Sequence, residues 1–445
     1  MYFTFAITYR CNGTVKQSRF KIFSDPVHGF ISVPQNLLLD LIETPEVQRL
    51  RRIRQLGLGH LVFPGAEHTR FNHALGAMAL MQEALAHLSE KGTPISAEEH
   101  LAACAAALLH DIGHGPFSHT LEHQLIEGFT HEAMSRQLLL RLNERFHGAL
   151  ELTIQIFDDL YPRPFFHQLV SSQLDMDRLD YLRRDSFYTG VVEGKVGVER
   201  IIKTLQVHPI EGGPDSRIVI ESKGIYAVEN FLIARRLMYW QVYLHKTVLA
   251  ADALLRSVIR RARSLIQAGD AQAATYCAPA LRFFLEHPLK APEALGRDEV
   301  IEAFCQLDDV DVLYSIKQWS QARDAVLADL SRRFLHRRFF RTTFLPQTPS
   351  PEQLAQWRGR IAQWLVQQGI VPKTQAEEAA TYYLTADASQ HTAYEPVADP
   401  IPVLDRDNQI RELSRTTDAP AIDAIARFVR KPYLCLPKEL PFELP

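Results

Sequence analysis

Four side chains of types that bind metals occur within ten residues of the sequence: His110, Asp111, His114 and His119. An apolar run, 101–109, predicts a helix that ends here, because glycines at 113 and 115 and a proline at 116 follow it. An imidazole beside a carboxylate suits mid-row transition metals and zinc, whereas calcium or magnesium alone favours oxygen ligands. The stretch therefore indicates a metal site; the alternative is a hydrogen-bonded His–Asp pair at a helix end.

Polar residues at helical spacing flank this stretch. Arg70 and His73 lie three positions apart, nearly on the same side of a helix turn. Asp177, Tyr181 and Asp185 follow at steps of four, which places them on one face of a helix predicted over 173–185. So many acidic groups beside a tyrosine would make a poor core. We therefore expect this face to line a site.

A third polar face is predicted in the long, mostly apolar helical stretch 225–262. Its members follow one another at steps of three and four residues: Arg235, Tyr239, Tyr243 and Lys246. One face of a continuous helix would then carry both cations and phenols.

The elements that position these residues are mainly helical. Helices are predicted over 73–88 and 98–109, and short strands at 21–23, 30–33 and 217–220. The fold class is therefore mainly α, with small β-hairpin additions. The predicted division has an N-terminal β segment (1–34), a helical core (35–265), a helical extension (266–345) and a C-terminal α+β region (346–445).

The last part of the chain mixes both kinds of structure. The basic aromatic run 332–341 is expected to be amphipathic with solvated charges, and the proline-rich stretch 345–351 is the best linker candidate. After a helix at 352–369, two β-like runs, 401–404 and 409–413, flank a turn.

Composition limits the classes of function. The chain has 445 residues, of which 46% are hydrophobic and 23% charged, as in an ordinary soluble globular protein. A net charge of −3 does not indicate nucleic-acid binding, and any anion site must be a local basic pocket. Five scattered cysteines without a C-x-x-C pair imply neither a disulfide framework nor a thiolate zinc site. Without an apolar run of 18 residues, we expect a cytoplasmic protein with no membrane partner.

The run His-Asp-Ile-Gly-His-Gly-Pro-Phe-Ser-His at 110–119 resembles the signature of HD-domain metal-dependent phosphohydrolases. In particular, it is similar to the deoxynucleoside triphosphate (dNTP) triphosphohydrolase branch, and the resemblance covers residues 20 to 265. It implies an HD-domain helical core that hydrolyses a dNTP to deoxynucleoside and tripolyphosphate. The tail, including Tyr394 and Tyr433, resembles that of bacterial members and has no role that we can assign.

The resemblance implies roles for individual residues. The implied metal ligands are His73, His110, Asp111 and Asp177, for one Fe, Mn, Ni or Zn ion, with Mg²⁺ on the triphosphate. His119, oriented by Glu122, is the candidate general acid, and His114 and His131 would lie at the phosphates. The implied substrate-binding residues are Gln55, Leu56, Arg70, Arg178, Tyr181, Asp185, Arg235, Tyr239, Tyr243 and Lys246. Tyr239 and Arg178 replace a histidine and a lysine of the vertebrate branch, so base or sugar preference can differ.

The resemblance also implies regulation by a nucleotide, GTP or a dNTP, bound between subunits of a homo-oligomer, a dimer or tetramer. Four residues match the effector-binding positions: Glu43, Gln48, Arg51 and Arg200. Glu43 stands where the vertebrate branch has an aspartate, which keeps the carboxylate but moves it by one methylene. The alternative is that these side chains make ordinary surface ion pairs.

Two other functions stay open on the sequence. One is another HD phosphohydrolase, acting on a nucleoside monophosphate, a cyclic dinucleotide or (p)ppGpp. Arg235, Tyr243 and Lys246 argue against a monophosphate, because one phosphate does not need so many cations. The other is a non-catalytic nucleotide sensor or nucleic-acid-binding module that keeps the metal site. The preferred base, the native metal and the biological role are not determined by the sequence.

Overall fold

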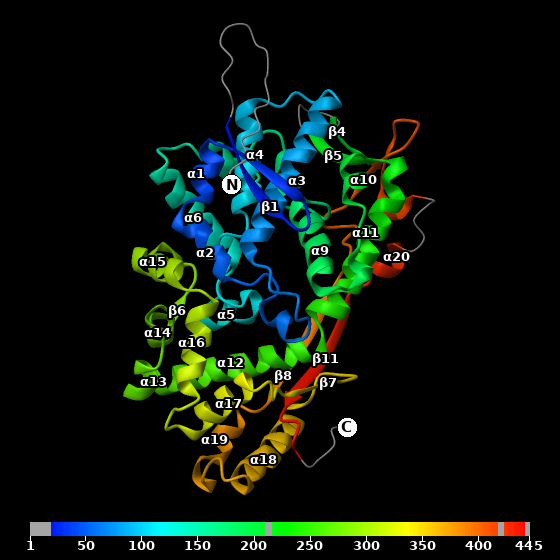
Figure 1. Cartoon of the computed structure of the whole chain (residues 1–445). Helices are drawn as coiled ribbons and strands as arrows, with labels where there is room; N and C mark the ends of the chain where they lie inside the picture. The colour runs from blue at the N-terminus through cyan, green and yellow to red at the C-terminus, as the bar shows by residue number, and fades with distance from the viewer. Residues whose placement is uncertain (1–18, 210–215, 417–421, 441–445) are drawn as a thin grey trace.

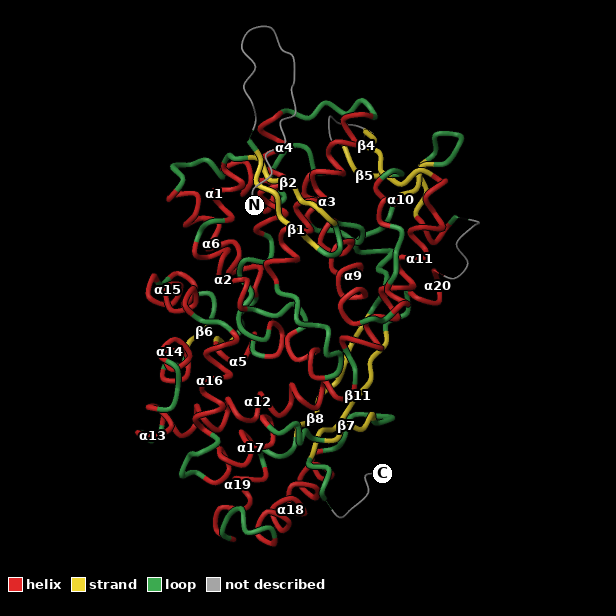
Figure 2. The backbone as a smooth tube through the Cα atoms, in the orientation of Figure 1, coloured by secondary structure: helices red, strands yellow, loops and turns green. Residues whose placement is uncertain are grey.

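The computed structural model describes residues 19–209, 216–416 and 422–440 of the chain (Figure 1). Residues 1–18 of the predicted N-terminal β segment lie outside the described residues. Helices dominate and the strands form small separate sheets (Figure 2), so the prediction of a mainly α fold is confirmed. Among the described residues, every helix falls short of the length or apolar character that a membrane span requires.

Three helices that pack together form the centre of the molecule: α3 (Arg70–Glu90), α4 (Ala97–Leu109) and α9 (Met176–Thr189). Helix α4 is capped by Ser96 and Glu99, and its apolar residues are buried almost all round. Helix α3 starts three residues earlier than predicted, so Arg70 lies on its first turn. Helix α9 starts at Met176 because Asp175 caps it, and the predicted start at 173 was wrong.

The stretch 225–262 is not one helix. It comprises α11 (Ile225–Met238), a π-helical turn (Tyr239–Tyr243) and α12 (Lys246–Gln267). The His245 side chain accepts the Thr247 N–H at 3.1 Å and caps α12, which gives the backbone an alternative to continuing the helix. Lys246 therefore does not share a face with Arg235: it is exposed, and its Nζ lies 5.5 Å from the centre of the Phe344 ring.

Four small sheets complete the fold of the described residues. Strands β1 (Phe20–Asp25) and β2 (Gly29–Pro34) form the predicted hairpin, and β3 (Ile126–Glu127) pairs with β6 (Leu289–Lys290). A four-stranded sheet has the order β10 (Ile410–Glu412), β9 (Pro402–Leu404), β5 (Ser216–Glu221), β4 (Leu205–Pro209), and its β9–β10 pair was predicted. A three-stranded sheet has the order β7 (Arg341–Phe344), β11 (Val429–Leu436), β8 (Thr385–His391).

Both larger sheets join the C-terminal region to earlier parts of the chain. Strand β9 pairs in parallel with β5, and β11 pairs antiparallel with β7. The stretch 345–351 connects β7 to α18. Strand β7, before this stretch, shares a sheet with β11, which comes after it in the chain. Most charges of the basic aromatic run are exposed as predicted, but Arg333 is buried, where it binds Asp329 and Glu439.

The other helices surround these elements. Their bounds are α1 (Leu37–Ile42), α2 (Pro45–Arg49), α5 (Glu122–Leu125), α6 (His131–Arg145), α7 (Glu151–Phe157), α8 (Phe165–Val170), α10 (Val198–Ile202), α13 (Ala271–Thr275), α14 (Pro279–Glu286), α15 (Asp298–Gln306), α16 (Asp309–Trp319), α17 (Ala325–Leu335), α18 (Pro351–Gln367), α19 (Ala376–Ala380) and α20 (Ile422–Ile425).

Helices α3 and α9 approach closely at Gly76, where an added Cβ would collide with the side chains of Asp180 and Arg184. We predict that Gly76→Ala destabilises the fold by roughly 1–3 kcal/mol, the range for overpacking. Gly359→Ala is the matched control, since Gly359 is also helical but has open space around it. Gly359→Ala should stabilise the folded protein by up to about 1 kcal/mol, because alanine has a higher helix propensity than glycine. Thermal unfolding measures both, and a Gly76→Ala protein as stable as Gly359→Ala would contradict the predicted packing.

Candidate metal centre and substrate cavity

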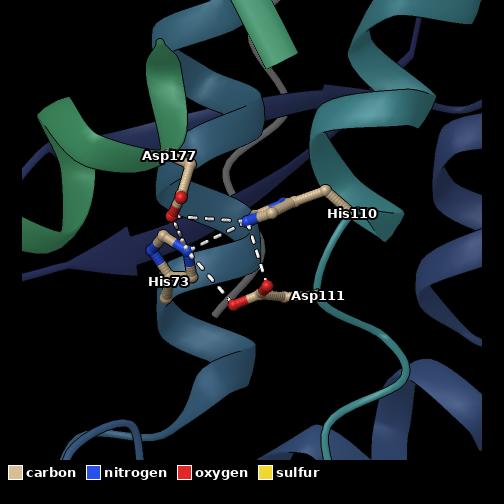
Figure 3. Close-up of side chains that lie close together, drawn as sticks. All are labelled: His73, His110, Asp111 and Asp177. Carbon is tan, nitrogen blue, oxygen red and sulfur yellow. Dashed lines mark hydrogen bonds and ion pairs between the residues drawn. The ribbon is translucent and has the colours of Figure 1, made fainter. Parts of the chain in front are cut away.

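The structure brings the four predicted metal ligands together (Figure 3): His73, His110, Asp111 and Asp177. They come from α3, the end of α4 and the first turn of α9, and one ligand atom from each lies within 4.8 Å of the others. Asp177 Oδ1 lies 3.0 Å from His73 Nε2 and 3.4 Å from His110 Nε2. Asp111 Oδ1 lies 3.5 Å from His110 Nε2. Two imidazole nitrogens and two carboxylates that converge on one position are a set of ligands that suits a divalent transition metal.

The outward nitrogens of both imidazoles are already hydrogen-bonded. His73 Nδ1 lies 2.8 Å from Asp180 Oδ2, and His110 Nδ1 lies 2.8 Å from the carbonyl oxygen of Ala107. These acceptors fix each ring with its proton on Nδ1, so that Nε2 is available to a metal. Sequence reasoning missed Asp180, although its position three residues after Asp177 on the same helix is a signal that could have found it.

Asp180 is the centre of a buried polar network. Its Oδ1 lies 2.6 Å from His28 Nε2, in the turn of the β1–β2 hairpin. Arg184 donates to Asp180 Oδ2 at 2.9 Å and to Asp25 Oδ2 at 2.7 Å. Burial by itself would raise the pKa of Asp180, but the charge of Arg184 and the bonds from both histidines hold the pKa well below its usual range.

The carboxylates favour positive charge at the centre of the cluster. Burial would lower the pKa of His73, but hydrogen bonds to Asp177 and Asp180 outweigh it and raise the pKa to about 10. Burial also lowers the pKa of His110, but the carboxylates of Asp111 and Asp177 outweigh it and raise the pKa to about 9. The field that stabilises these imidazoliums would also attract a divalent cation.

A second histidine cluster lies beside the first. His114 stacks on His131 with ring centres 3.8 Å apart, and His119 meets both edge-on. Glu122 bridges the cluster, because its carboxylate lies 2.8 Å from His119 Nδ1 and 2.7 Å from His131 Nδ1. Burial and the nearby Arg70 keep the pKa of His114 well below its usual range, whereas Glu122 outweighs burial and raises the pKa of His131. The His119 side chain is 70% exposed, so a bound ligand can reach it.

A cavity of about 610 Å³ opens onto both clusters. Its volume is in the range of small-molecule sites in proteins. It is lined by nine of the ten predicted substrate-binding residues: Gln55, Leu56, Arg70, Arg178, Tyr181, Asp185, Arg235, Tyr239 and Tyr243. The tenth, Lys246, does not line it, because the chain turns at His245.

Hydrogen bonds fix the cavity walls. Tyr243 donates to Asp185 at 2.8 Å, and Asp185 in turn lies 2.6 Å from His68 Nε2. Arg235 donates to Gln173 at 2.9 Å and to the carbonyl oxygen of Ala393 at 3.1 Å. The C-terminal region thus contributes to holding the wall.

The loop between His110 and His119 is held by two buried residues that sequence reasoning missed. Arg49 donates to the carbonyl oxygens of Ile112 and His114, each at 2.9 Å, and to that of Leu307. Asp309, at the start of α16, accepts the N–H of Phe117 at 2.9 Å. Phe117 has a φ of 53°, a left-handed conformation that a side chain disfavours and that this bond helps to hold. No local pattern marks either contact, because each joins distant parts of the chain.

The predicted effector residues make contacts within the chain. Arg51 donates to Gln48 at 2.9 Å and lies over the Phe71 ring, and Glu43 lies 2.9 Å from Lys21 Nζ. Arg200 donates to the carbonyl oxygen of Lys223 at 3.0 Å. Within the described ranges, Arg200 has no hydrogen bond or ion pair with the other three.

Comparison with known proteins places this geometry in a family. Residues 70–162 match the HD domain and residues 196–278 the HD associated region. YwfO of Bacillus subtilis is 34% identical over 415 residues, which cover 90% of this chain and 88% of that protein. The crystal structure of a phosphohydrolase from Bacteroides thetaiotaomicron covers 94% of this chain, and all of that structure is matched, with 44% identity and a TM-score of 0.86.

A human relative is named for its activity. The deoxynucleoside triphosphate triphosphohydrolase SAMHD1 of Homo sapiens is 30% identical over 289 residues, which are 56% of this chain and 45% of that protein. The chain therefore spans less than half of the human protein's length. The chain belongs to the HD-domain family, as a member that carries an HD associated region after its HD domain and has SAMHD1 among its homologues.

Proposed function

We propose that this HD-domain phosphohydrolase hydrolyses dNTPs to deoxynucleoside and tripolyphosphate. The observation that carries the proposal is the cavity that is lined by two of the four ligands, Asp111 and Asp177, and by arginines that include Arg70, Arg178 and Arg235. One phosphate would not need three guanidinium groups, whereas a triphosphate carries enough charge to engage all of them. The homology to SAMHD1 supports the same substrate class.

The metal would be held by His73, His110, Asp111 and Asp177 and would be Fe, Mn, Ni or Zn, with Mg²⁺ on the triphosphate. When bound, such ions activate water and stabilise the charge that develops on phosphoryl oxygens. Arg70 is oriented for the same charge, because it donates to Ser118 Oγ at 2.9 Å and to Asp111, a predicted ligand. The side chains thus position the α-phosphate beside the attacking water.

The histidine cluster would serve the leaving group. Water attacks the α-phosphorus, becomes a hydroxyl group of the tripolyphosphate and gives up one proton to solvent. The bond from phosphorus to the 5′ oxygen breaks, that oxygen takes a proton from His119, and solvent returns a proton to His119. Glu122 orients His119 through its bond to Nδ1, which leaves Nε2 to face the ligand. His131, with its raised pKa, would supply positive charge near the phosphates, and neutral His114 a hydrogen bond.

The sugar would lie against Tyr243 and Gln55. Asp185 holds the Tyr243 hydroxyl, so moving the ring aside for a 2′-hydroxyl group would break that hydrogen bond. Gln55 Oε1 is buried without a hydrogen-bond partner in the described structure, which suits an acceptor waiting for the 3′-hydroxyl group.

The proposed reaction can be tested by identifying its products. The metal-loaded protein is incubated with each dNTP and rNTP in ¹⁸O-water, and products are separated by anion exchange. We expect tripolyphosphate that carries ¹⁸O and a deoxynucleoside whose 5′ oxygen does not. Orthophosphate or pyrophosphate as the primary product would instead indicate another HD phosphohydrolase. Nucleotide binding without turnover would indicate a sensor.

Metal ligation and acid catalysis can be separated by two variants. His110→Ala should lose most of the bound metal and all turnover, because one of four ligands is gone. His119→Ala should keep its metal and lower kcat by roughly 10²–10⁴-fold, the usual range for a lost acid. Exposed His123 provides the control, and His123→Ala should change neither quantity. Full metal occupancy in His110→Ala, measured by elemental analysis, would rule out this ligand set.

We further propose that a nucleotide activates the protein by binding between subunits at Glu43, Gln48, Arg51 and Arg200. Arg51 is exposed and its guanidinium is already held by Gln48 and Phe71, which limits the entropy lost when it binds phosphate. Adding GTP or a second dNTP should then raise the rate on a poor substrate and shift the protein toward a larger oligomer.

Arg51→Ala should abolish that stimulation while metal content stays normal. Arg358→Ala, which removes an exposed arginine on α18, is the control and should respond like the wild type. Hyperbolic kinetics without stimulation, in a protein whose mass by light scattering is independent of nucleotide, would contradict the activation proposal.

A further inference from the structure

Helix α12 brings a carboxylate and a guanidinium to the wall of the cavity. Asp252 and Arg256 both line it, and apolar Val248 and Leu249 line it on the turn before. The two charged residues are one helical turn apart, yet no ion pair within 4 Å joins them in the described part of the chain. Both therefore keep hydrogen-bonding capacity for a ligand, and the proposed chemistry uses neither of them.

Asp252 lies on the side of the cavity from which the nucleoside would leave. Its Oδ1 accepts the hydroxyl hydrogen bond of Thr120 at 2.7 Å, and Thr120 follows His119 directly. Because the proposed acid delivers its proton to the 5′ oxygen, the departing nucleoside must lie next to His119. Asp252 and Arg256, which line the cavity on the helix that contacts Thr120, are then placed to meet its base.

Arg256 is supported from outside the cavity by the C-terminal sheet. Its Nη2 lies 3.6 Å from Asp387 Oδ2 on β8, and Tyr433 on β11 donates to the same carboxylate at 3.2 Å. Nη2 is buried and has no hydrogen-bond partner among the residues that the structure describes, so the side chain has donor capacity to spare. The sheet contacts hold the guanidinium at the cavity wall and give Tyr433 a role as a positioning residue.

The chemistry of this wall fits one kind of base. Apolar side chains suit the faces of a flat heterocycle, while a carboxylate accepts from ring N–H and amino donors and a guanidinium donates to ring acceptors. Guanine offers both: N1–H and the 2-amino group as donors, and O6 and N7 as acceptors that arginine binds in pairs. Burial raises the pKa of Asp252 to about 6, so it is still mostly an ionised acceptor above pH 7.

We propose that Asp252 and Arg256 form a base-recognition subsite that favours guanine. The proposal rests on the proposed dNTP hydrolysis, because it concerns the base of that substrate.

The test compares kcat/KM for dGTP, dATP, dCTP and dTTP in the wild type, Asp252→Asn and Arg256→Met. The wild type should prefer dGTP, and each variant should lose about tenfold or more on dGTP relative to dTTP. Arg260→Met is the matched control: Arg260 lies one turn further along α12, donates to the carbonyl oxygen of Thr381 and does not line the cavity. It should keep the wild-type ranking.

A second measurement uses the unmodified protein, so it holds even if a variant fails to fold. Deoxyinosine triphosphate lacks the 2-amino group, and 7-deaza-dGTP lacks N7. The wild type should discriminate against both, because each analogue lacks one group that the subsite would bind. Turnover of dNTPs with the same ranking in every protein would overturn the subsite alone. Absence of turnover on any dNTP would overturn the proposed function and the subsite with it.

Discussion

The buried carboxylate of Asp180 is the interaction on which the rest of the centre depends. A charge without solvent must be compensated by donors, and Asp180 has three, from His73, His28 and Arg184. To bring them together, α3 must approach α9 at Gly76 and the β1–β2 hairpin must fold across both. The bond to His73 then sets which nitrogen faces the cluster, so the packing of three distant segments determines the chemistry of one ligand.

A similar dependence governs the loop that follows the ligands. Arg49 and Asp309 lie outside residues 70–162, which match the HD domain, yet they hold the backbone at Ile112, His114 and Phe117. Inside the matched region the Gly113 N–H donates to Ser135, but the contacts to the carbonyl oxygens of Ile112 and His114 and to the Phe117 N–H come from outside it. Elements added around the HD domain therefore supply rigidity that the motif lacks, and the geometry of the histidine cluster depends on α16 as much as on its own sequence.

The spacing of residues along the sequence was enough to predict many of the helices. The features that were missed depend on contacts between residues far apart in the sequence. Helical periodicity identified α4, most of α9 and the face with Asp177, Tyr181 and Asp185, although it placed the start of α9 three residues too early, while the family resemblance supplied the ligand set. Asp180 was missed because its partner His73 is 107 residues away, and Asp309 because Phe117 is 192 residues away. The prediction that Lys246 shares a helix face with Arg235 was wrong, because periodicity assumes a continuous helix and nothing in the apolar pattern reveals that His245 starts a new one.

The position of β11 in the sequence has a consequence for biosynthesis. This strand is central in its sheet, between β7 and β8, but it is made after both of them, near the end of the described chain. As the polypeptide leaves the ribosome, α3, α4 and α9 can assemble well before β11 exists, since domains tend to fold in the order of synthesis. The outer support of α12 would be added last. A nascent chain would thus acquire its metal-binding capacity first and the finished shape of its cavity only once β11 has been made.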